Sequence, residues 1–488
     1  MTEVIAIFDI GKTNKKVLLF NKDLNILYQK EQKFSEIEDE DGFPCDNIQL
    51  IEEWIKRTLA ELSANPQYEI KAVNFSTYGA TLMFIDDKGK PVTPLYNYLK
   101  PMPEEITKAF YDRHGGMEEF SRITASPALG FLNSGLQILW LKRTKPEIYA
   151  KVKHVLHFPQ YCSYLLSNKL VSEYTSIGCH TAMWDFNDMN YHDWLSAEDI
   201  HLPDPVPNTK IFNIAEDLLN TEAYTHNAPA SQINNPDTAR ATDSKSAVAT
   251  SSINNTSFVT GTGIHDSSAS LAPYIIASKK KFILLSTGTW CINMNPYNYE
   301  PLTEEELQND CLSYLSITQK PVKSSRLFMG HMHDVNLERL NAHFNMDSNA
   351  FKQVRYNPTL TGNIIGNGMK FFAEGIPESY IDEAIDYNSF ASFDEAYHQL
   401  MIDLTLLNKK SIDFVIPEKD TIECIYISGG FARNEIFVRC LAKLYSNKKV
   451  YTSEIDNATA LGAAMVVYNA FGQDSEPLPD LGLQLWEQ

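Results

Sequence analysis

The sequence predicts an α/β protein built from two domains. Short apolar runs that suit buried strands alternate with segments of helical periodicity, and the second half of the chain repeats this theme without obvious sequence identity to the first. The chain has 488 residues, which at about 150 residues per domain suggests two large domains or three small ones. We expect two α/β domains, each with a glycine turn that follows a strand.

Composition and charge exclude several other classes of protein. The chain carries 42 Lys and Arg against 62 Asp and Glu, a net charge of −20, which disfavours a nucleic-acid partner. No apolar run reaches the ~18–20 residues that span a bilayer, and the N-terminus lacks the basic region of a signal peptide. The seven cysteines show no CxxC spacing, which favours reduced thiols in a cytoplasmic protein.

The first half of the chain opens with strands joined by tight polar turns. Residues 4–8, 17–20 and 26–29 are short apolar runs, and their close spacing predicts a hairpin rather than a strand–loop–helix unit. Residues 46–62 have apolar positions at helical spacing, with Asp46 as the expected N-cap. Further strands are expected at 71–75 and 81–85, and further helices at 134–142 and 146–152.

The second half begins after a segment of unusual composition. Residues 221–256 are rich in Ala, Ser, Thr and Asn, so we expect a long surface insertion, with a lid or an oligomer contact as alternatives. Beyond it, strands are expected at 281–285, 422–427 and 449–452, and helices at 394–415, 434–444 and 458–470. The tail after residue 474 is expected to be extended or to dock on the protein.

Three turns that follow predicted strands have the composition of phosphate-binding loops. Residues 9–16 combine an acid and a glycine with hydroxyl, amide and ammonium donors, although a hairpin turn with solvated lysines has the same composition. Residues 286–289 form the second turn, and residues 428–434 form the third, where a double glycine precedes a predicted helix. Neither a GxxxxGK[ST] nor a GxGxxG sequence is present, which weakens P-loop and Rossmann interpretations.

The order of these three turns resembles the FGGY family of carbohydrate kinases, within the actin, hexokinase and Hsp70 superfamily. Residues 128–141, 158–161, 263–266 and 457–464 also match this family, and residues 77–79, 263–266 and 286–290 are similar to its L-fuculose and L-rhamnulose kinases. The resemblance implies two ribonuclease-H-like domains with a cleft between them. Residues 1–272 would bind the sugar and residues 273–488 the nucleotide.

The resemblance also implies roles for individual residues. Asp266 matches the catalytic base, which takes the proton of a sugar hydroxyl as the γ-phosphoryl group arrives. Asp9 matches the acid that binds Mg²⁺, through water in many such sites. The expected ATP contacts are Asp9, Gly11, Lys12, Thr13, Asn14, Lys16, Gly288, Thr289, Gly429, Gly430 and Asn434. The expected sugar contacts are Thr77, Tyr78, Gly79, His265 and Asp266.

Departures from the family pattern leave the identity of the sugar open. Lys12 stands where the family usually has a small hydroxyl residue, so it either adds charge near the γ-phosphate or points to solvent. Ala80 and Thr81 replace an acid that often follows Gly79 in related kinases, and residues 95–98 replace an apolar-Trp-acid pattern. An unpaired buried hydroxyl costs roughly 1–3 kcal/mol, so a 6-deoxyketose, another ketohexose and a ketopentose all remain candidates.

We therefore expect a cytoplasmic, Mg²⁺-dependent kinase that phosphorylates a ketose at a primary hydroxyl. L-fuculose and L-rhamnulose, giving 1-phosphates, are the expected substrates, and the pentuloses xylulose and ribulose are the alternatives. A non-metabolic ATPase of the same superfamily is a second alternative. We expect no nucleic-acid or membrane partner, and a homodimer is one option for the assembly.

Overall fold

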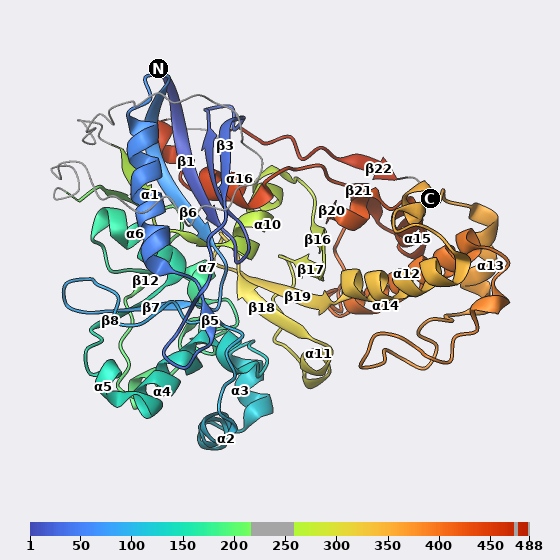
Figure 1. Cartoon of the computed structure of the whole chain (residues 1–488), viewed down its shortest axis with the longest axis horizontal. Coiled ribbons are helices and arrows are strands. Elements are labelled where there is room, and N and C mark those ends of the chain that lie inside the picture. The colour runs from blue at the N-terminus through green and yellow to red at the C-terminus, as the bar shows by residue number, and fades with distance from the viewer. Residues whose placement is uncertain (216–257, 473–476, 487–488) are drawn as a thin grey trace.

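The computed structural model describes residues 1–215, 258–472 and 477–486. The insertion predicted at residues 221–256 lies outside the described residues. The described chain forms two seven-stranded sheets with helices packed around them, one in each half of the chain (Figure 1). No helix in these three ranges has the length and apolar character that a membrane crossing needs.

The first sheet has the strand order β13-β14-β6-β1-β2-β3, with β15 paired to β6. Its strands are β1 (Thr2–Ile10), β2 (Lys15–Phe20), β3 (Ile26–Gln32), β6 (Tyr68–Thr77), β13 (Ile211–Asn213), β14 (Val259–Gly261) and β15 (Ile264–His265). Because β1, β2 and β3 pair antiparallel in sequence order, the predicted N-terminal hairpin is confirmed. The central strand β1 is also parallel to β6.

The second sheet has the order β18-β19-β17-β16-β20-β21-β22. Its strands are β16 (Phe282–Thr287), β17 (Cys291–Asn295), β18 (Cys311–Leu315), β19 (Pro321–Leu327), β20 (Cys424–Gly429), β21 (Lys449–Thr452) and β22 (Gln484–Trp486). Strand β16 is antiparallel to β17 and parallel to β20, as β1 is to β2 and β6. The second half therefore repeats the central topology of the first, as the sequence predicts.

Helices and short ladders complete both halves. The first half contains α1 (Ile48–Ser63), α2 (Glu104–Arg113), α3 (Met117–Ile123), α4 (Ser134–Thr144), α5 (Pro146–Tyr149), α6 (Phe158–Ser167), α7 (Tyr174–Ile177), α8 (Trp194–Ala197) and α10 (Asp266–Ala277). The second half contains α11 (Glu304–Gln308), α12 (Met329–Phe344), α13 (Pro358–Asn367), α14 (Phe393–Asp413), α15 (Glu435–Leu444) and α16 (Ala458–Met465). The short strands are β4 (Ile37–Glu38), β5 (Pro44–Cys45), β7 (Leu82–Ile85), β8 (His154–His157), β9 (Ser172–Glu173), β10 (Trp184–Asp185), β11 (Asn190–Tyr191) and β12 (Pro205–Val206).

Two helix starts differ from the sequence-based predictions. Helix α1 begins at Ile48 with Asn47 as its N-cap, so the prediction of Asp46 as the cap is wrong: the Asp46 carboxylate binds two lysines instead. The double glycine of the third turn leads into a 3₁₀ turn, Gly430–Arg433, and α15 begins only at Glu435. The glycines therefore do not themselves form the helix N-terminus.

The two halves meet along α10 and α16, which lie close together in Figure 1. A Cβ on Gly462 of α16 would stand 1.9 Å from the carbonyl oxygen of Ala269, so the contact excludes any side chain there. Although α16 lies near the C-terminus, it packs on the first sheet, where the Asn74 amide donates to the Ala463 carbonyl at 2.8 Å. The predicted domain boundary at 272/273 falls within α10 and stays a prediction.

Candidate active site

The ends of three neighbouring parallel strands bring the predicted catalytic segments together in the first sheet. Thr77 of β6 is paired with Ile10 of β1 on one side and with His265 of β15 on the other. The turn after β1, the turn that begins at Tyr78, and Asp266 therefore lie at one edge of this sheet. We call this the first edge.

Asp9 and Asp266 form a pair of electrostatically coupled carboxylates at the first edge. Asp9 lies opposite Lys16 in the β1–β2 ladder, and Asp266 is the first residue of α10, with 35% of its side chain exposed. Burial and the Asp266 charge raise the pKa of Asp9 to about 6, against the effect of Lys16. Burial raises the pKa of Asp266 to about 6, against hydrogen bonds from Ser267. Such coupled acids are typical of sites that move protons or bind cations.

His265 supports Asp266 from within the protein. It is 5% exposed, and its Nε2 lies 3.2 Å from Asp266 Oδ1 and 3.3 Å from Cys179 Sγ. Burial lowers the pKa of His265 to about 4, so the ring is neutral near pH 7. A Cβ on Gly79 would lie 2.7 Å from His265 Nε2, so the predicted sugar turn needs its glycine for this packing.

A buried ionic network holds the turn after β1. Asp46 accepts hydrogen bonds from Lys12 and Lys15, both at 2.8 Å, and from the Tyr78 hydroxyl at 2.7 Å. Lys12 also pairs with Glu36 at 2.7 Å. The Lys12 ammonium is therefore engaged by two carboxylates on the Tyr78 side of the turn. Its predicted contact with phosphate stays a prediction.

The other predicted phosphate ligands of this turn have fewer partners. The Gly11 N–H donates to the Asn14 carbonyl at 2.9 Å and closes the turn, while Thr13 is exposed. The Asn14 Oδ1 atom is buried and has no hydrogen-bond partner among the described residues. Lys16 Nζ donates to Asn457 Oδ1 at 3.4 Å, which adds the N-cap of α16 to this edge.

The first edge suits a divalent cation. Carboxylate oxygens are ligands that Mg²⁺ prefers, and it usually keeps several waters and binds through one or two carboxylates plus substrate phosphates. Asp9 supplies such a carboxylate. Burial and the Asp266 charge disfavour its charged form, Lys16 opposes them, and the pKa of Asp9 is raised as a result. A bound cation would remove that penalty.

The second edge is the corresponding end of the second sheet. Thr287 of β16 is paired with Gly429 of the parallel strand β20, so the turns at 288–289 and 429–430 leave the sheet side by side. Gly429 has φ +86°, and a Cβ there would lie 2.0 Å from the Thr287 carbonyl oxygen. The Phe431 N–H donates to Thr287 Oγ1 at 3.0 Å and ties the two turns together. These two turns offer backbone groups and hydroxyls and carry no charged side chain.

Asn434, predicted on the adenosine side, is engaged within the fold. Its Oδ1 caps α15 by accepting from the N–H groups of Ile436 and Phe437, and its Nδ2 donates to the Tyr397 hydroxyl at 2.9 Å. His333 Nε2 lies 3.2 Å from the same hydroxyl. The predicted nucleotide contact of Asn434 is neither supported nor excluded by these bonds.

Two tyrosines beside Asp266 had no role predicted from the sequence. Burial raises the pKa of Tyr98, with Lys12 opposing and Asp266 adding to the shift, so its hydroxyl lies near both. Tyr314 comes from β18 of the second sheet and packs edge-on against the His265 ring, with 6.4 Å between ring centroids. No local sequence signal marks Tyr314, because its neighbours along the chain are ordinary strand residues.

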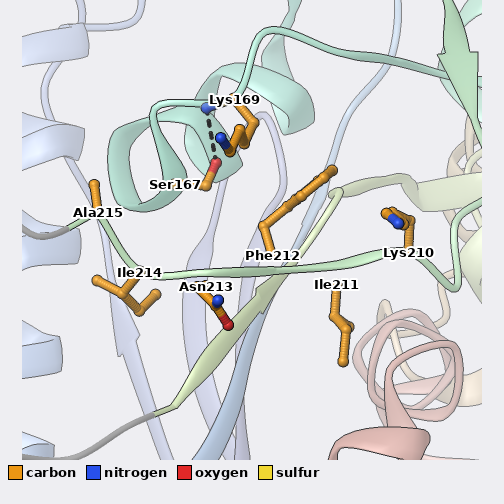
Figure 2. A pocket seen from close by; sticks show the side chains of 8 residues that line it. All are labelled: Ser167, Lys169, Lys210, Ile211, Phe212, Asn213, Ile214 and Ala215. Carbon is orange, nitrogen blue, oxygen red and sulfur yellow. Dashed lines mark hydrogen bonds between the residues drawn. The ribbon is translucent and has the colours of Figure 1, made fainter.

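A separate surface pocket lies beside β13 (Figure 2). It has a volume of about 400 Å³ and is lined by Ser167, Lys169 and residues 210–215. The Lys169 N–H donates to the Ser167 hydroxyl at 3.2 Å, as the dashed line in Figure 2 marks. None of the predicted site residues lines this pocket, so we assign it no role.

Several known proteins resemble this chain over part or most of its length. A gluconokinase of Bacillus subtilis is 24% identical over 217 residues, covering 43% of this chain and 42% of that protein. A rhamnulokinase of Halalkalibacterium halodurans is 22% identical, covering 36% and 39%. A ribulokinase of Staphylococcus saprophyticus is 23% identical over 461 residues, covering 88% and 79%. The chain thus aligns with about two fifths of the first two relatives and about four fifths of the third.

The fold agrees with a solved structure and with two family models. A carbohydrate kinase from Novosphingobium aromaticivorans superposes with a TM-score of 0.77 at 22% identity, covering 100% of this chain and 94% of that one. The predicted fold of two ribonuclease-H-like domains in the actin-like ATPase arrangement is thereby confirmed. Residues 4–223 match the N-terminal domain of the FGGY family of carbohydrate kinases, and residues 337–470 match its C-terminal domain. The chain therefore belongs to the FGGY family of carbohydrate kinases.

Proposed function

We propose that this chain transfers the γ-phosphoryl group of ATP to a primary hydroxyl of a ketose. The observation that carries the proposal is the register of β1, β6 and β15, which brings Asp9, the turn at Tyr78 and Asp266 to the edge where the first glycine turn leaves its sheet. Family membership supports the reaction class, and the glycine turns after β1, β16 and β20 let a phosphate approach the backbone closely.

In the proposed mechanism, Asp266 is the general base. Its carboxylate accepts the proton of the sugar hydroxyl as that oxygen attacks the γ-phosphorus in line. The neutral His265 ring packs beside the carboxylate, with its Nε2 3.2 Å from Asp266 Oδ1, and the Ser267 hydroxyl donates to the same oxygen. Lys16, opposite Asp9 in the ladder, supplies a positive charge near the phosphates. A Mg²⁺ ion held by Asp9 would neutralise charge on the transferred group.

For the sugar, we propose a deoxyketohexose such as L-fuculose or L-rhamnulose, with the 1-phosphate as product. The His265–Asp266 pair and the turn at residues 286–290 support this branch, and the rhamnulokinase is among the relatives. A pentulose such as xylulose or ribulose is the second candidate, because the ribulokinase aligns over 88% of the chain.

We also propose that the protein is located in the cytoplasm. Its seven cysteines are buried and form no disulfide, which fits a reducing compartment.

The test is ADP release with MgATP in the presence of L-fuculose, L-rhamnulose, L- and D-ribulose, D-xylulose and glycerol. We expect one ketose to be strongly preferred. Asp266→Asn, which preserves shape, should lower kcat for that ketose about 10²- to 10⁴-fold, because the base is lost. Asp199→Asn, a substitution at an exposed acid, is the matched control and should leave kcat unchanged.

Each outcome separates the alternatives. A near wild-type rate for Asp266→Asn overturns the assignment of the base. If none of the six acceptors stimulates ADP release while the protein still binds ATP, the ketose proposal is overturned. In that case ATP-dependent filament formation without sugar-dependent ADP release would support the non-metabolic ATPase of the same superfamily.

A further inference from the structure

We propose that the β18–β19 hairpin of the second sheet forms a wall of the sugar pocket, and that Tyr314 and Arg326 bind the sugar. The inference rests on the proposed function, because it names further ligands of the same substrate. The predicted sugar contacts all come from the first 272 residues, whereas these two residues lie beyond them.

Tyr314 and Arg326 project from the same face of the hairpin. Strands β18 and β19 pair antiparallel, with Tyr314 opposite Val322 and Cys311 opposite Ser325. Arg326 is ion-paired with Asp310, which immediately precedes β18. Because side chains at even spacing along a strand share a face, Val322 and Arg326 of β19 point to one side, and Tyr314, which is opposite Val322, joins them there.

The hairpin is fixed to the first half of the chain. The Ser268 hydroxyl of α10 donates to the Leu315 carbonyl at 2.9 Å, and the Ser313 N–H donates to the Ala125 carbonyl at 3.4 Å. A Cβ on Gly178 would lie 2.4 Å from Leu315 Cγ. Figure 1 shows the hairpin between the two halves. It is therefore held next to the segment that carries the base.

The Tyr314 hydroxyl lies near the base and lacks a partner. Tyr314 is 3% exposed, it packs against His265, and its hydroxyl has no hydrogen-bond partner among the described residues. The Tyr314 ring packs against the His265 ring, and His265 Nε2 in turn lies 3.2 Å from Asp266 Oδ1, so one side chain separates Tyr314 from the base. A buried hydroxyl without a partner is costly. A sugar oxygen bound beside Asp266 would remove that cost.

Arg326 offers a second unpaired donor from the same face. One end of its guanidinium is held by Asp310, and the group lies over the Trp290 ring, 5.5 Å from the centroid. Its Nε atom is buried and has no partner among the described residues. The Arg326 side chain is 19% exposed, so most of it lies within the protein rather than in solvent.

These two groups point to the part of the ketose that they recognise. The hydroxyl that reacts, at C1, must lie on Asp266, so the nearest neighbouring oxygen is the one on C2. A phenol and a guanidinium N–H both donate, and an oxygen at C2 accepts. We therefore assign Tyr314 to the C2 oxygen and Arg326 to an oxygen further along the sugar. Tyr314 and Arg326 would thus supply donors to a sugar pocket in which the acid that often follows Gly79 in related kinases is absent.

The first test is the variant Tyr314→Phe. Its KM is measured for the preferred ketose, and the alditol of the same sugar serves as a competitive inhibitor. We expect the KM for the ketose to rise about three- to tenfold, with the KM for ATP unchanged. The melting temperature should not fall and should rise slightly, because Phe removes a buried hydroxyl that has no protein partner. The matched control is Tyr274→Phe in the same buried cluster, whose hydroxyl bonds Ser453 at 2.9 Å: it should lower the melting temperature and leave the ketose KM unchanged.

The second test is Arg326→Lys, which keeps the positive charge and removes the Nε donor. We expect the ketose KM to rise about tenfold or more, since hydrogen bonds from charged donors are the stronger ones. Wild-type ketose KM values in both variants would overturn the inference and leave the proposed function standing. If the wild-type protein phosphorylates no ketose, the proposed function fails first and the inference fails with it.

Discussion

The two sheets share their central topology but present different chemistry at equivalent strand ends. At the first edge, Asp9, Asp266 and the Asp46 network place charged groups in buried surroundings. At the second edge, the turns at 288–289 and 429–430 carry no charged side chain and depend on close backbone contacts. The comparison teaches that the topology determines where a ligand lies, whereas the charge of the side chains decides which edge can move a proton.

Under the proposed function, this contrast predicts that changes at the two edges affect different measurable properties. Changes at the first edge should alter folding, the sugar or the chemical step, because they alter charges that have few partners. Changes at the second edge should alter the binding of ATP, because they alter the shape of the backbone. Three perturbations test the contrast.

The largest effect is expected from Asp46→Ala at the first edge. Lys15 is buried, and without the Asp46 carboxylate its ammonium would keep only the Lys12 carbonyl, at 2.9 Å. Removing one partner of a buried ion pair costs about 3–5 kcal/mol, so we expect the free energy of unfolding in urea to fall by that amount. The loss should be smaller for Asp46→Asn, which retains an acceptor.

The control for Asp46 is an exposed pair of the same chemistry. Lys108 and Asp112 lie 2.6 Å apart with both side chains mostly exposed. Asp112→Ala should change the free energy of unfolding by less than about 1 kcal/mol. Equal losses for the two variants would show that the network around Asp46 is no more important than a surface pair.

The role of Asp46 also shows what the sequence could not predict. An acid just before a helix has the same local pattern whether it caps the helix or binds distant lysines, and here Asn47 takes the cap. Lys15 likewise belongs to a lysine-rich turn that suggests solvated side chains, yet it is 1% exposed. The decisive contact joins residues 31 positions apart, and no local pattern encodes it.

What the sequence does predict depends on local signals. The strands at both edges follow from apolar runs, and the turns follow from glycines that the backbone requires, such as Gly429 with its positive φ. Asp266 could be placed because it lies in a short motif. Tyr314 could not, because it reaches His265 from a strand of the other sheet, and nothing in its own strand marks that contact.

A smaller effect, on ATP rather than on folding, is expected from Gly429→Ala at the second edge. The new Cβ would lie 2.0 Å from a backbone oxygen at a φ of +86°, so the turn must move. Backbone strain of this kind costs about 1–3 kcal/mol, which corresponds to a rise in the KM for ATP of about fivefold or more. The KM for the ketose should not change.

Gly430→Ala is the neighbouring control. A Cβ there would meet its nearest atom, the Thr287 carbonyl oxygen, at 3.9 Å, which is an ordinary contact. Its KM for ATP should stay within about twofold of the wild-type value, since no strain of the kind at Gly429 is introduced. If the two variants behave alike, the shape of this turn does not determine nucleotide binding.

The last effect, which needs no substitution, is a dependence of the chemical step on pH that we assign to the first edge. Asp266 must be ionised to accept a proton, and its pKa is about 6. The value of kcat/KM for the ketose should therefore rise with pH, reach half its maximum at about pH 6 and level off above about pH 7, with a loss of about tenfold at pH 5. The free energy of unfolding should show the opposite dependence on pH. Because burial raises the pKa values of Asp9 and Asp266 above 3.8, these two groups lower the free energy of unfolding as the pH rises from about 4 to about 6.

Ser267→Ala sharpens this last prediction by moving the midpoint. The Ser267 hydroxyl donates to Asp266 Oδ1 at 3.2 Å and favours the charged carboxylate. Without it the pKa of Asp266 should rise, and the midpoint of kcat/KM should shift to higher pH, while the plateau at high pH is largely retained. The KM for ATP should show no such shift, because Ser267 donates to Asp266 and not to Asp9. A midpoint near 4, or one that Ser267→Ala leaves in place, would mean that a group other than Asp266 accepts the proton.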